Sequence, residues 1–316
     1  MLAVKVIQEQ NIEVIGLNFK SQFFGLTDVE KYERQLNIKI KTIDITKPYL
    51  QILLHPKHGY GKNANPCIDC HAYMIERAVE IMHKMGAKFV FTGEVLNERP
   101  FSQNFKSLSI VGAQGGDEGY LVRPLSAKFL KKSIPEQTGI LDRDKLYAIS
   151  GRSRKKQIEL AEKYNIRDFP QPGGGCVLTD PSFSKRVFSL KRAGVTDLRQ
   201  YMLIKIGRHI WLDDSVKIVV TRHKEDDDAL GALLRSSDTV YEFPEIPGPR
   251  AAAFSYKRGR HFPDDVISRI LAGYVGKKQK PPFVINKKRG RKIVRTYSID
   301  KNIESSETAG LYKWKE

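Results

Sequence analysis

Three cysteines are the residues of this chain whose spacing most clearly suggests chemistry. Cys67 and Cys70 stand close together in NPCIDC, whereas Cys176 lies far downstream in QPGGGCVLTD. The first two lie at the start of an expected helix that ends at Gly86. Because the unpaired N–H groups and the dipole of a helix N-terminus stabilise negative charge, we expect lowered pKa values for these thiols. Thiolates of this kind serve metal ligation or sulfur chemistry.

Four interpretations of the cysteines remain open on the residues alone. They could be small buried residues, or a dithiol redox pair that leaves Cys176 unused. A structural zinc ion would need a fourth ligand, for which His71 or a remote histidine is the candidate. An iron–sulfur cluster held by three thiolates uses every cysteine and leaves one iron open for reaction. The low, odd cysteine count argues against a disulfide framework and predicts a reducing, cytoplasmic compartment.

The composition predicts two domains and a polyanionic partner. A chain of 316 residues is long for one domain. No stretch approaches about 18 uninterrupted apolar residues, so we expect no membrane span. The 54 basic and 36 acidic residues give a net charge of +18, which favours nucleic acid as a partner. Residues 276–295 hold nine basic residues and no acidic one. Their interleaving with apolar residues predicts a basic strand pair, the alternative being a solvated face or tail.

In the first half of the chain, expected strands alternate with expected helices. The strands cover residues 12–19, 37–45 and 87–95, and the helices cover 1–11, 27–35, 70–86 and 153–166. This order predicts an α/β fold with a doubly wound, Rossmann-like parallel sheet. Ligands of such sheets bind beyond the carboxyl ends of the strands. We therefore predict nucleotide contacts from Asn18, Phe19, Thr92 and Gly93, with Arg123 near the same rim.

The second half has a different texture. Beyond Pro181 the expected elements are shorter, and the strands at 206–212, 216–223 and 238–249 are separated by turns. We place the boundary near residues 180–195, which gives a domain over 1–185 and a smaller, β-rich α+β domain over 186–316.

Several segments of the first domain resemble the bacterial tRNA-specific 2-thiouridylases. NPCIDCHAYMIERA is similar to the family's N-P-D-x-x-C motif, and PGGGCVLTD to the segment of its second essential cysteine. FTGEV and LVRPLSAKFL resemble its A-T-G-H-Y and R-P-L-x-x-x-K segments. Because Cys67 stands where that family has aspartate, the trio is closer to the iron–sulfur-dependent tRNA thiolases.

The resemblance implies a PP-loop ATP pyrophosphatase-like domain with the adenine nucleotide alpha hydrolase-like fold. Such an enzyme uses ATP and Mg²⁺ to adenylate a uridine carbonyl oxygen of tRNA, and sulfur then replaces the oxygen. Cys67, Cys70 and Cys176 would be the catalytic residues and the ligands of a [4Fe–4S] cluster, with zinc as the lesser alternative. Alternatively, Cys176 would carry a persulfide that Cys70 resolves. The sulfur donor would be sulfide or a persulfide carrier.

Two departures from this family stand out. Glu94 occupies the position of the histidine in A-T-G-H-Y. The sequence also contains no S-G-G-x-D-S loop, which normally follows the first strand and holds the ATP phosphates. MLAVKVI looks like the helix that follows that loop. We therefore expect either a chain that starts late or a degenerate, non-catalytic member.

A second resemblance covers part of the C-terminal domain. IGRHIWLDDSVKIVVTRHKEDDDALGAL is similar to the RNA-binding module of the NFACT ribosome-associated family. Arg222 stands where that family has arginine, whereas His223 replaces its asparagine. The expected function is tRNA thiolation, and the alternative is a non-catalytic RNA-binding protein. The predicted RNA contacts are Arg152, Arg154, Arg222, Lys287, Lys288, Arg289 and Arg291.

Overall fold

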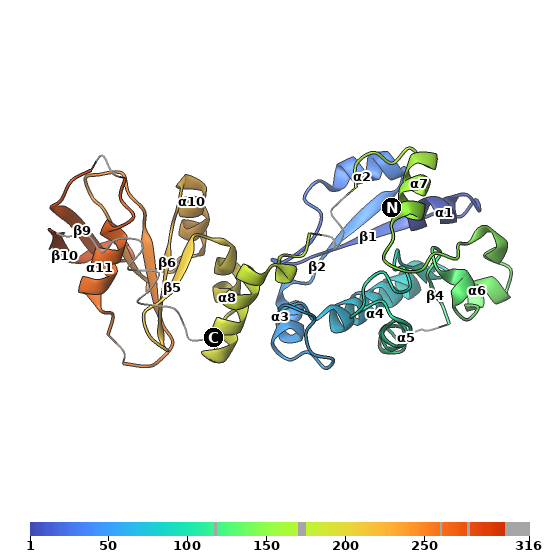
Figure 1. Ribbon diagram of the computed structural model, residues 1–316, viewed down its shortest axis with the longest axis horizontal. Coiled ribbons are helices and arrows are strands. Elements are labelled where there is room, and N and C mark those ends of the chain that lie inside the picture. The colour runs from blue at the N-terminus through green and yellow to red at the C-terminus, as the bar shows by residue number, and fades with distance from the viewer. Residues whose placement is uncertain (117–118, 170–174, 260, 277–278, 301–316) are drawn as a thin grey trace. The chain divides into compact units, whose positions relative to one another are not determined.

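The computed structural model describes residues 1–116, 119–169, 175–259, 261–276 and 279–300 (Figure 1). The chain divides into an N-terminal unit, Met1–Ser184, and a C-terminal unit, Lys185–Glu316. Two of the three consecutive glycines before Cys176, Gly173 and Gly174, lie outside the described residues. None of the helices in the described ranges is long and apolar enough to cross a membrane.

The N-terminal unit is built from short strands and helices that alternate along the chain. Its strands are β1 (Ile15–Lys20), β2 (Lys39–Asp44), β3 (Val90–Phe91) and β4 (Leu121–Val122). Its helices are α1 (Leu2–Gln8), α2 (Val29–Leu36), α3 (Thr46–Leu54), α4 (Cys67–Met85), α5 (Phe105–Gln114), α6 (Ile134–Gln137) and α7 (Lys155–Lys163). Three 3-10 turns lie at η1 (Ala127–Phe129), η2 (Arg143–Lys145) and η3 (Val177–Thr179). Helix α8 (Pro181–Arg192) begins in this unit.

Local signals account for the ends of the helices. The Asp28 side chain accepts a hydrogen bond from the Lys31 N–H and so caps the N-terminus of α2. Helix α4 ends at Gly86 in the left-handed conformation, as its sequence predicts. The helices at 1–11, 27–35, 70–86 and 153–166 are all present. Helix α3 was not predicted.

The strands are parallel but do not form the expected single sheet. β1 pairs with β2, and β3 pairs with β4, in two separate two-stranded parallel sheets. The prediction of one doubly wound Rossmann-like sheet is therefore not met among the described residues. Backbone hydrogen bonds do not join β1 to β3, and the strand expected over 87–95 is reduced to two residues. The unit has a mixed α/β fold.

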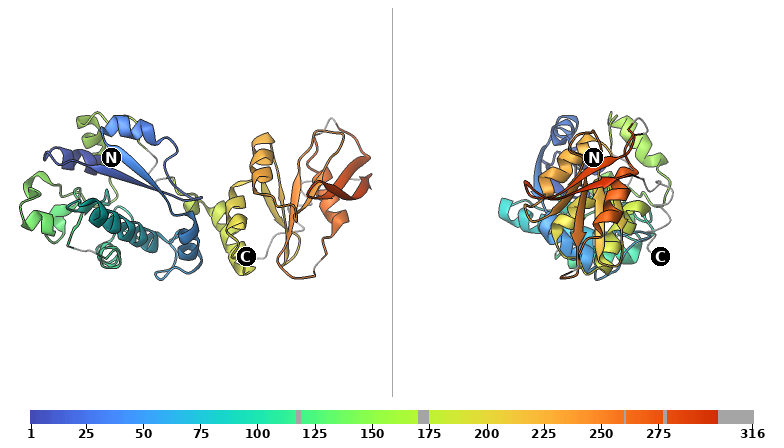
Figure 2. Two further views of the ribbon diagram at one scale, coloured as in Figure 1. Left: turned by 180° about the vertical axis from the view of Figure 1, so that it is seen from behind. Right: turned by 90° about the vertical axis from the view of Figure 1, so that its left-hand side faces the viewer.

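The C-terminal unit contains a six-stranded antiparallel sheet in the order β10-β9-β7-β8-β6-β5. Its strands are β5 (Arg208–Trp211), β6 (Val216–Val220), β7 (Thr239–Glu242), β8 (Ala251–Ser255), β9 (Phe283–Arg289) and β10 (Lys292–Ile299). Its helices are α9 (Leu198–Met202), α10 (Lys224–Leu233) and α11 (Asp264–Ala272), with the 3-10 turn η4 (Leu203–Lys205). Helix α11 packs on β7 and β10 (Figure 2).

The basic segment at 276–295 contributes most of an antiparallel hairpin. Strands β9 and β10 turn at Gly290, which has a φ of +58° that favours glycine. The sequence prediction of a basic strand pair is confirmed. Strand β10 lies at the edge of the sheet, and its residues from Lys292 to Thr296 are exposed.

Candidate functional site

The three cysteines come from two distant segments of the N-terminal unit. Cys67 and Cys70 lie in the first turn of α4. Cys176 is the N-cap residue of η3. The N–H that follows Cys176 donates to the Phe23 carbonyl, in the turn after β1, at 3.1 Å. This bond fixes the Cys176 segment against the carboxyl end of a strand.

The loop before α4 also binds the segment that follows Cys176. The Asn63 side-chain amide donates to the Thr179 carbonyl at 2.6 Å, across 116 residues of sequence. The Ala64 N–H donates to Ser184 Oγ, also at 2.6 Å. These two bonds hold the Cys67 and Cys176 segments together independently of any ligand.

The thiols meet around the buried hydroxyl of Tyr49 on α3. Burial raises the pKa of Tyr49 well above its ordinary value, and the neighbouring Cys70, Cys176 and Cys67 raise it further. Burial also raises the pKa of Cys70, and the proximity of Cys176 and Cys67 adds to this effect. All three thiols are therefore within electrostatic reach of one another and of one tyrosine.

The expectation of lowered thiol pKa values is wrong for both cysteines of α4. Burial raises the pKa of Cys67 as well as that of Cys70. A helix terminus stabilises a nearby negative charge by about 0.3–1 kcal/mol at exposed sites. Full burial can destabilise a charge by several kcal/mol, since it can move a pKa by about 3–5 and each pKa unit corresponds to about 1.4 kcal/mol. Burial therefore outweighs the dipole. The two thiols are protonated until a metal ion or another strong charge displaces the proton.

Asn65 and Gly61 shape the surroundings of the Cys67 thiol. Asn65 Nδ2 donates to Cys67 Sγ at 3.1 Å, and Asn65 Oδ1 accepts from the Asn63 N–H at 3.1 Å. A Cβ added at Gly61 would lie 2.5 Å from Asn65 Nδ2. The glycine therefore leaves room for the amide that orients the thiol.

Donor groups close to the thiols in sequence are already engaged. The Asp69 carboxylate accepts the N–H groups of Lys57 and His58 at 3.0 and 3.1 Å. His71 Nδ1 contacts Glu94, which leaves only Nε2 of this histidine for a ligand. Among the described residues, no three His, Cys, Asp or Glu side chains are arranged as ligands of one metal ion. The chemistry of a purely thiol donor set nonetheless suits an iron–sulfur cluster.

A cavity of about 910 Å³ is lined by residues of β1 and β3. All four predicted nucleotide residues, Asn18, Phe19, Thr92 and Gly93, lie on its wall. Its volume is within the range of about 300–1,000 Å³ of small-molecule sites. A Cβ added at Gly93 would meet no atom within 4 Å, so the backbone there faces open space. The structure thus brings these four residues to one cavity.

Two of these four residues have polar groups with internal partners. Asn18 Nδ2 donates to Thr42 Oγ1 at 3.2 Å, and Asn18 Oδ1 accepts from the Leu26 N–H at 3.2 Å. Thr92 Oγ1 donates to Glu94 at 3.0 Å. The Asn18 amide therefore joins β1 to β2 and to the turn after β1, and its share in any adenine contact is limited.

A histidine and a buried carboxylate face the same cavity. His71 Nδ1 lies 2.8 Å from Glu94 Oε1, and Arg123 Nε donates to Glu94 Oε2 at 2.9 Å. Burial acts to raise the pKa of Glu94, but bonding and charge from His71 and Arg123 lower it to about 2. Because an ionised carboxylate only accepts, Nδ1 carries the proton and Nε2 is left for a ligand. His71 and Glu94 both line the cavity.

The seven predicted RNA-binding cations fall into two groups. Four of them pair with carboxylates: Arg154 with Glu98, Arg222 with Asp226, Lys287 with Asp264, and Lys288 with Glu242. The other three are exposed and form no ion pair within the described ranges: Arg152, Arg289 and Arg291. Of these seven residues, only the three in the second group offer a phosphate a positive charge that no carboxylate already neutralises.

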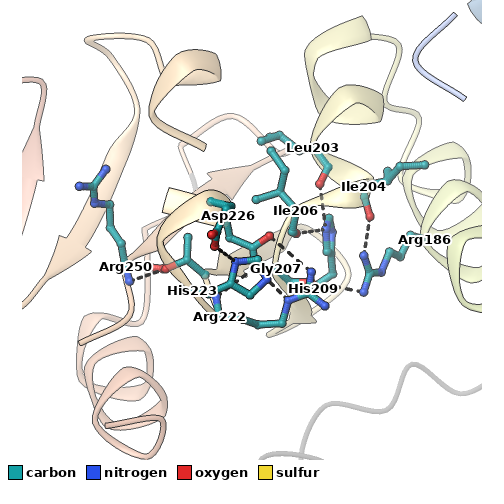
Figure 3. A network of polar contacts seen from close by, with 12 residues as sticks. Arg186, Leu203, Ile204, Ile206, Gly207, His209, Arg222, His223, Asp226 and Arg250 are labelled. Carbon is teal, nitrogen blue, oxygen red and sulfur yellow. Dashed lines mark hydrogen bonds and ion pairs between the residues drawn. The ribbon is translucent and has the colours of Figure 1, made fainter. Parts of the chain in front are cut away.

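Figure 3 shows the polar network around the I-G-R-H segment of the C-terminal unit. Nε2 of the half-buried His209 contacts the carbonyls of Leu203 and Ile206 at 3.1 and 3.0 Å, so it carries the proton. Arg186 donates to the Gly207 carbonyl at 3.4 Å. Gly207 has a φ of +64°, and a Cβ there would lie 2.3 Å from a backbone oxygen. These contacts fix the backbone of the segment at the start of β5.

Two features of the site escaped the sequence prediction. Tyr49 lies on helix α3, which was not predicted. The third residue of this helix is Pro48, and proline is a poor signal for a helix interior. The His71–Glu94 pair joins two segments whose proximity no spacing rule reveals. One signal was available in the sequence: Glu94 stands where the resemblance leads one to expect a histidine. In the structure His71, from α4, lines the same cavity as Glu94. Comparison with known protein families, curated proteins and solved structures gives no match for this chain.

Proposed function

We propose that this chain is an ATP-dependent sulfur transferase that acts on a uridine of tRNA. One observation carries the proposal: three cysteines from two distant segments lie within electrostatic reach of one tyrosine, and the residue after Cys70 lines a cavity that holds all four predicted nucleotide residues. Helix α4 links the two features, because Cys70 belongs to the thiol cluster and the next residue, His71, lines the cavity.

The parallel strands support a finer proposal about the fold. We propose that β1–β2 and β3–β4 are the two halves of one parallel sheet, with room for a further strand between β1 and β3. Parallel strands occur almost only inside larger sheets covered on both faces. The facing edges line the cavity with Ile15 and Leu17 from β1 and Phe91 from β3. A nucleotide would then occupy the polar end of the cavity, near Thr92 and Gly93.

In the first step of the proposed reaction, a uridine carbonyl oxygen attacks the α-phosphorus of ATP. The new O–P bond forms, pyrophosphate leaves, and the adjacent N3–H must lose its proton. His71 Nε2 is the base that takes it, since Glu94 holds Nδ1 protonated and stabilises the resulting imidazolium. In the second step sulfur attacks the adenylated carbon, AMP leaves, and His71 returns the proton to N3.

The cysteines would hold the sulfur-handling group. Cys67, Cys70 and Cys176 are the residues that would ligate a [4Fe–4S] cluster, whose open iron supplies a place to hold sulfide when the cluster is bound. A persulfide relay between Cys176 and Cys70 is the alternative, and it needs thiolates at neutral pH. The C-terminal unit would hold tRNA through Arg289 and Arg291.

Nucleoside analysis of tRNA tests the function in the cell. Disruption of the gene should remove one thiouridine from the digest of total tRNA. The wild-type gene should restore it, and a gene carrying Cys176→Ala should not. An unchanged thiouridine content would contradict the proposal. If the purified chain still binds tRNA in that case, the non-catalytic RNA-binding alternative replaces it.

A further inference from the structure

A second, smaller cavity lies in the C-terminal unit, where α11 and the loop before it meet the β9–β10 hairpin. Its volume is about 270 Å³, and Thr239, His261, Phe262, Asp264, Lys287, Arg289 and Val294 line it. This is slightly below the range of about 300–1,000 Å³ of sites for drug-sized ligands. It has room for one ring system rather than for several.

One wall of this cavity is a closed polar network. Lys287 Nζ donates to both oxygens of Asp264 at 2.9 Å, and the hydroxyls of Tyr241 and Tyr297 donate to the same carboxylate. Burial acts to raise the pKa of Asp264, but the hydrogen bonds from Tyr241 and Tyr297 lower it below its ordinary value. The carboxylate is therefore ionised and satisfied, so this wall is rigid and carries little net charge.

The rest of the lining supplies an aromatic ring next to Lys287 and an exposed arginine. Phe262 is half-buried, and its ring lies 5.8 Å from Lys287 Nζ. Arg289 and His261 are exposed on the rim. Beyond the rim, Arg291, Lys292 and Arg295 are exposed along the hairpin, and none of them has an ion pair among the described residues. The cavity thus opens onto a positive strip.

We propose that this cavity binds one unstacked base of single-stranded RNA, which stacks on Phe262 while its flanking phosphates follow the exposed cations of the hairpin. The inference rests on the proposed tRNA-binding function and specifies how the RNA is held. Single-stranded nucleic acids are bound in this way, by aromatic stacking for the bases and a positive track for the backbone.

Charge and size select this occupant over others. Because the cations beyond the rim form a strip, they match a chain of phosphates better than a single anion. A base has a flat apolar face for Phe262 and polar edges for Thr239 and the rim, whereas an apolar peptide side chain would leave these polar groups without partners. A paired base in a duplex is stacked on both faces and cannot enter.

Oligonucleotide binding to the full chain tests the inference. The probe is a labelled single-stranded oligouridylate, titrated by fluorescence anisotropy at two salt concentrations, with a blunt RNA duplex of equal length for comparison. Phe262→Leu keeps apolar packing but removes the stacking ring. Phe243→Leu is the matched control, because Phe243 packs partly buried on the same core and does not line the cavity. Arg289→Gln has Arg258→Gln as its charge-matched control.

Phe262→Leu should weaken oligouridylate binding by about 5- to 150-fold, the loss of one stacked base, without changing the salt dependence. Arg289→Gln should flatten the slope of log K against log salt by about 0.7. Both controls and duplex binding should stay near the parent. Equal effects of Phe262→Leu and Phe243→Leu would overturn the base-binding cavity while leaving tRNA binding intact. A parent that binds no RNA would instead remove the tRNA-binding function together with this inference.

Photo-crosslinking gives a second measurement that does not depend on a variant. Ultraviolet crosslinks of the oligouridylate should map to the peptide that contains Phe262. Crosslinks that map only outside the residues lining the cavity would contradict the inference even if both phenylalanine variants lose affinity through misfolding.

Discussion

Glu94 in the N-terminal unit and Lys217 in the C-terminal unit are charged residues that are almost wholly buried, 6% and 1% exposed. Glu94 is bonded to His71, Thr92 and Arg123, and its pKa falls to about 2. Lys217 Nζ has no hydrogen-bond partner among the described residues, and burial, followed by the charge of Arg186, lowers its pKa to about 7. Burial alone therefore does not fix the protonation state of a charged group, because the partners of that group decide it.

The buried thiols extend this comparison. Like Lys217, Cys67 and Cys70 are pushed by burial towards their neutral forms, but unlike Lys217 they lie near groups of their own kind. If these thiols hold a four-iron cluster, replacement of one thiol should have the largest effect of all, a complete loss of iron.

After anaerobic reconstitution with iron and sulfide, the parent chain should contain about one four-iron cluster. Cys176→Ala should contain essentially none, and the exposed Ser153→Ala should match the parent. Iron and acid-labile sulfide analysis with an absorbance spectrum provides the measurement. Stoichiometric zinc without iron, or an unchanged spectrum in Cys176→Ala, would exclude the cluster.

Removal of the uncompensated charge should stabilise the protein. The pKa of Lys217 is near 10.5 in the unfolded chain and about 7 in the folded protein. Between pH 7 and pH 10.5 the unfolded state therefore binds more protons than the folded state. Stability of the parent should therefore rise with pH across this window, by about 1.4 kcal/mol per unit, and the penalty is largest at pH 7 and below. Lys217→Met should be more stable there by about 5 kcal/mol and should lose the slope.

Denaturant unfolding followed by Trp211 fluorescence measures this effect at several pH values. Lys257→Met is the matched control, because Lys257 is exposed and its change should stay within about 0.5 kcal/mol. A parent and a Lys217→Met variant with parallel pH profiles would show that Lys217 finds a partner after all.

The contrast also shows what the sequence could predict. The element types of the N-terminal unit follow from local signals such as Asp28 and Gly86, and the motif residues around Cys67 and Cys176 follow from a resemblance in the same segments. Thiol pKa values could not be predicted, because they depend on how deeply Tyr49 and its neighbours are buried. The ion pair between Lys287 and Asp264 could not be predicted either, because a run of basic residues does not show which of them lie next to a carboxylate.

Glu94 should show the opposite behaviour to Lys217. Its folded pKa of about 2 lies below the usual 4.5, so its stabilising contribution is full above pH 4.5 and disappears as the pH falls through 2. Glu94→Gln should cost about 3 kcal/mol at pH 7 and almost nothing near pH 2. Hydrogen exchange of the α4 amides reports on this unit, and the exposed Glu159→Gln is the control. A constant difference at all pH values would mean that the cost is one of shape rather than of charge.

The smallest effects are expected on the β9–β10 hairpin, where paired and unpaired cations stand side by side. Arg289 and Arg291 are exposed, whereas Lys287 and Lys288 are bonded to Asp264 and Glu242. Arg289→Ser with Arg291→Ser should weaken binding to all tRNAs alike and flatten the salt slope by about 1.4–1.8, without a change in stability.

Lys287→Ser with Lys288→Ser should lower stability by about 1–3 kcal/mol, because two carboxylates lose their partners. It should leave the salt slope nearly unchanged, and neither variant should alter the iron content. Equal salt slopes for the two double variants would mean that RNA displaces the carboxylates, and the division into paired and unpaired cations would then fail.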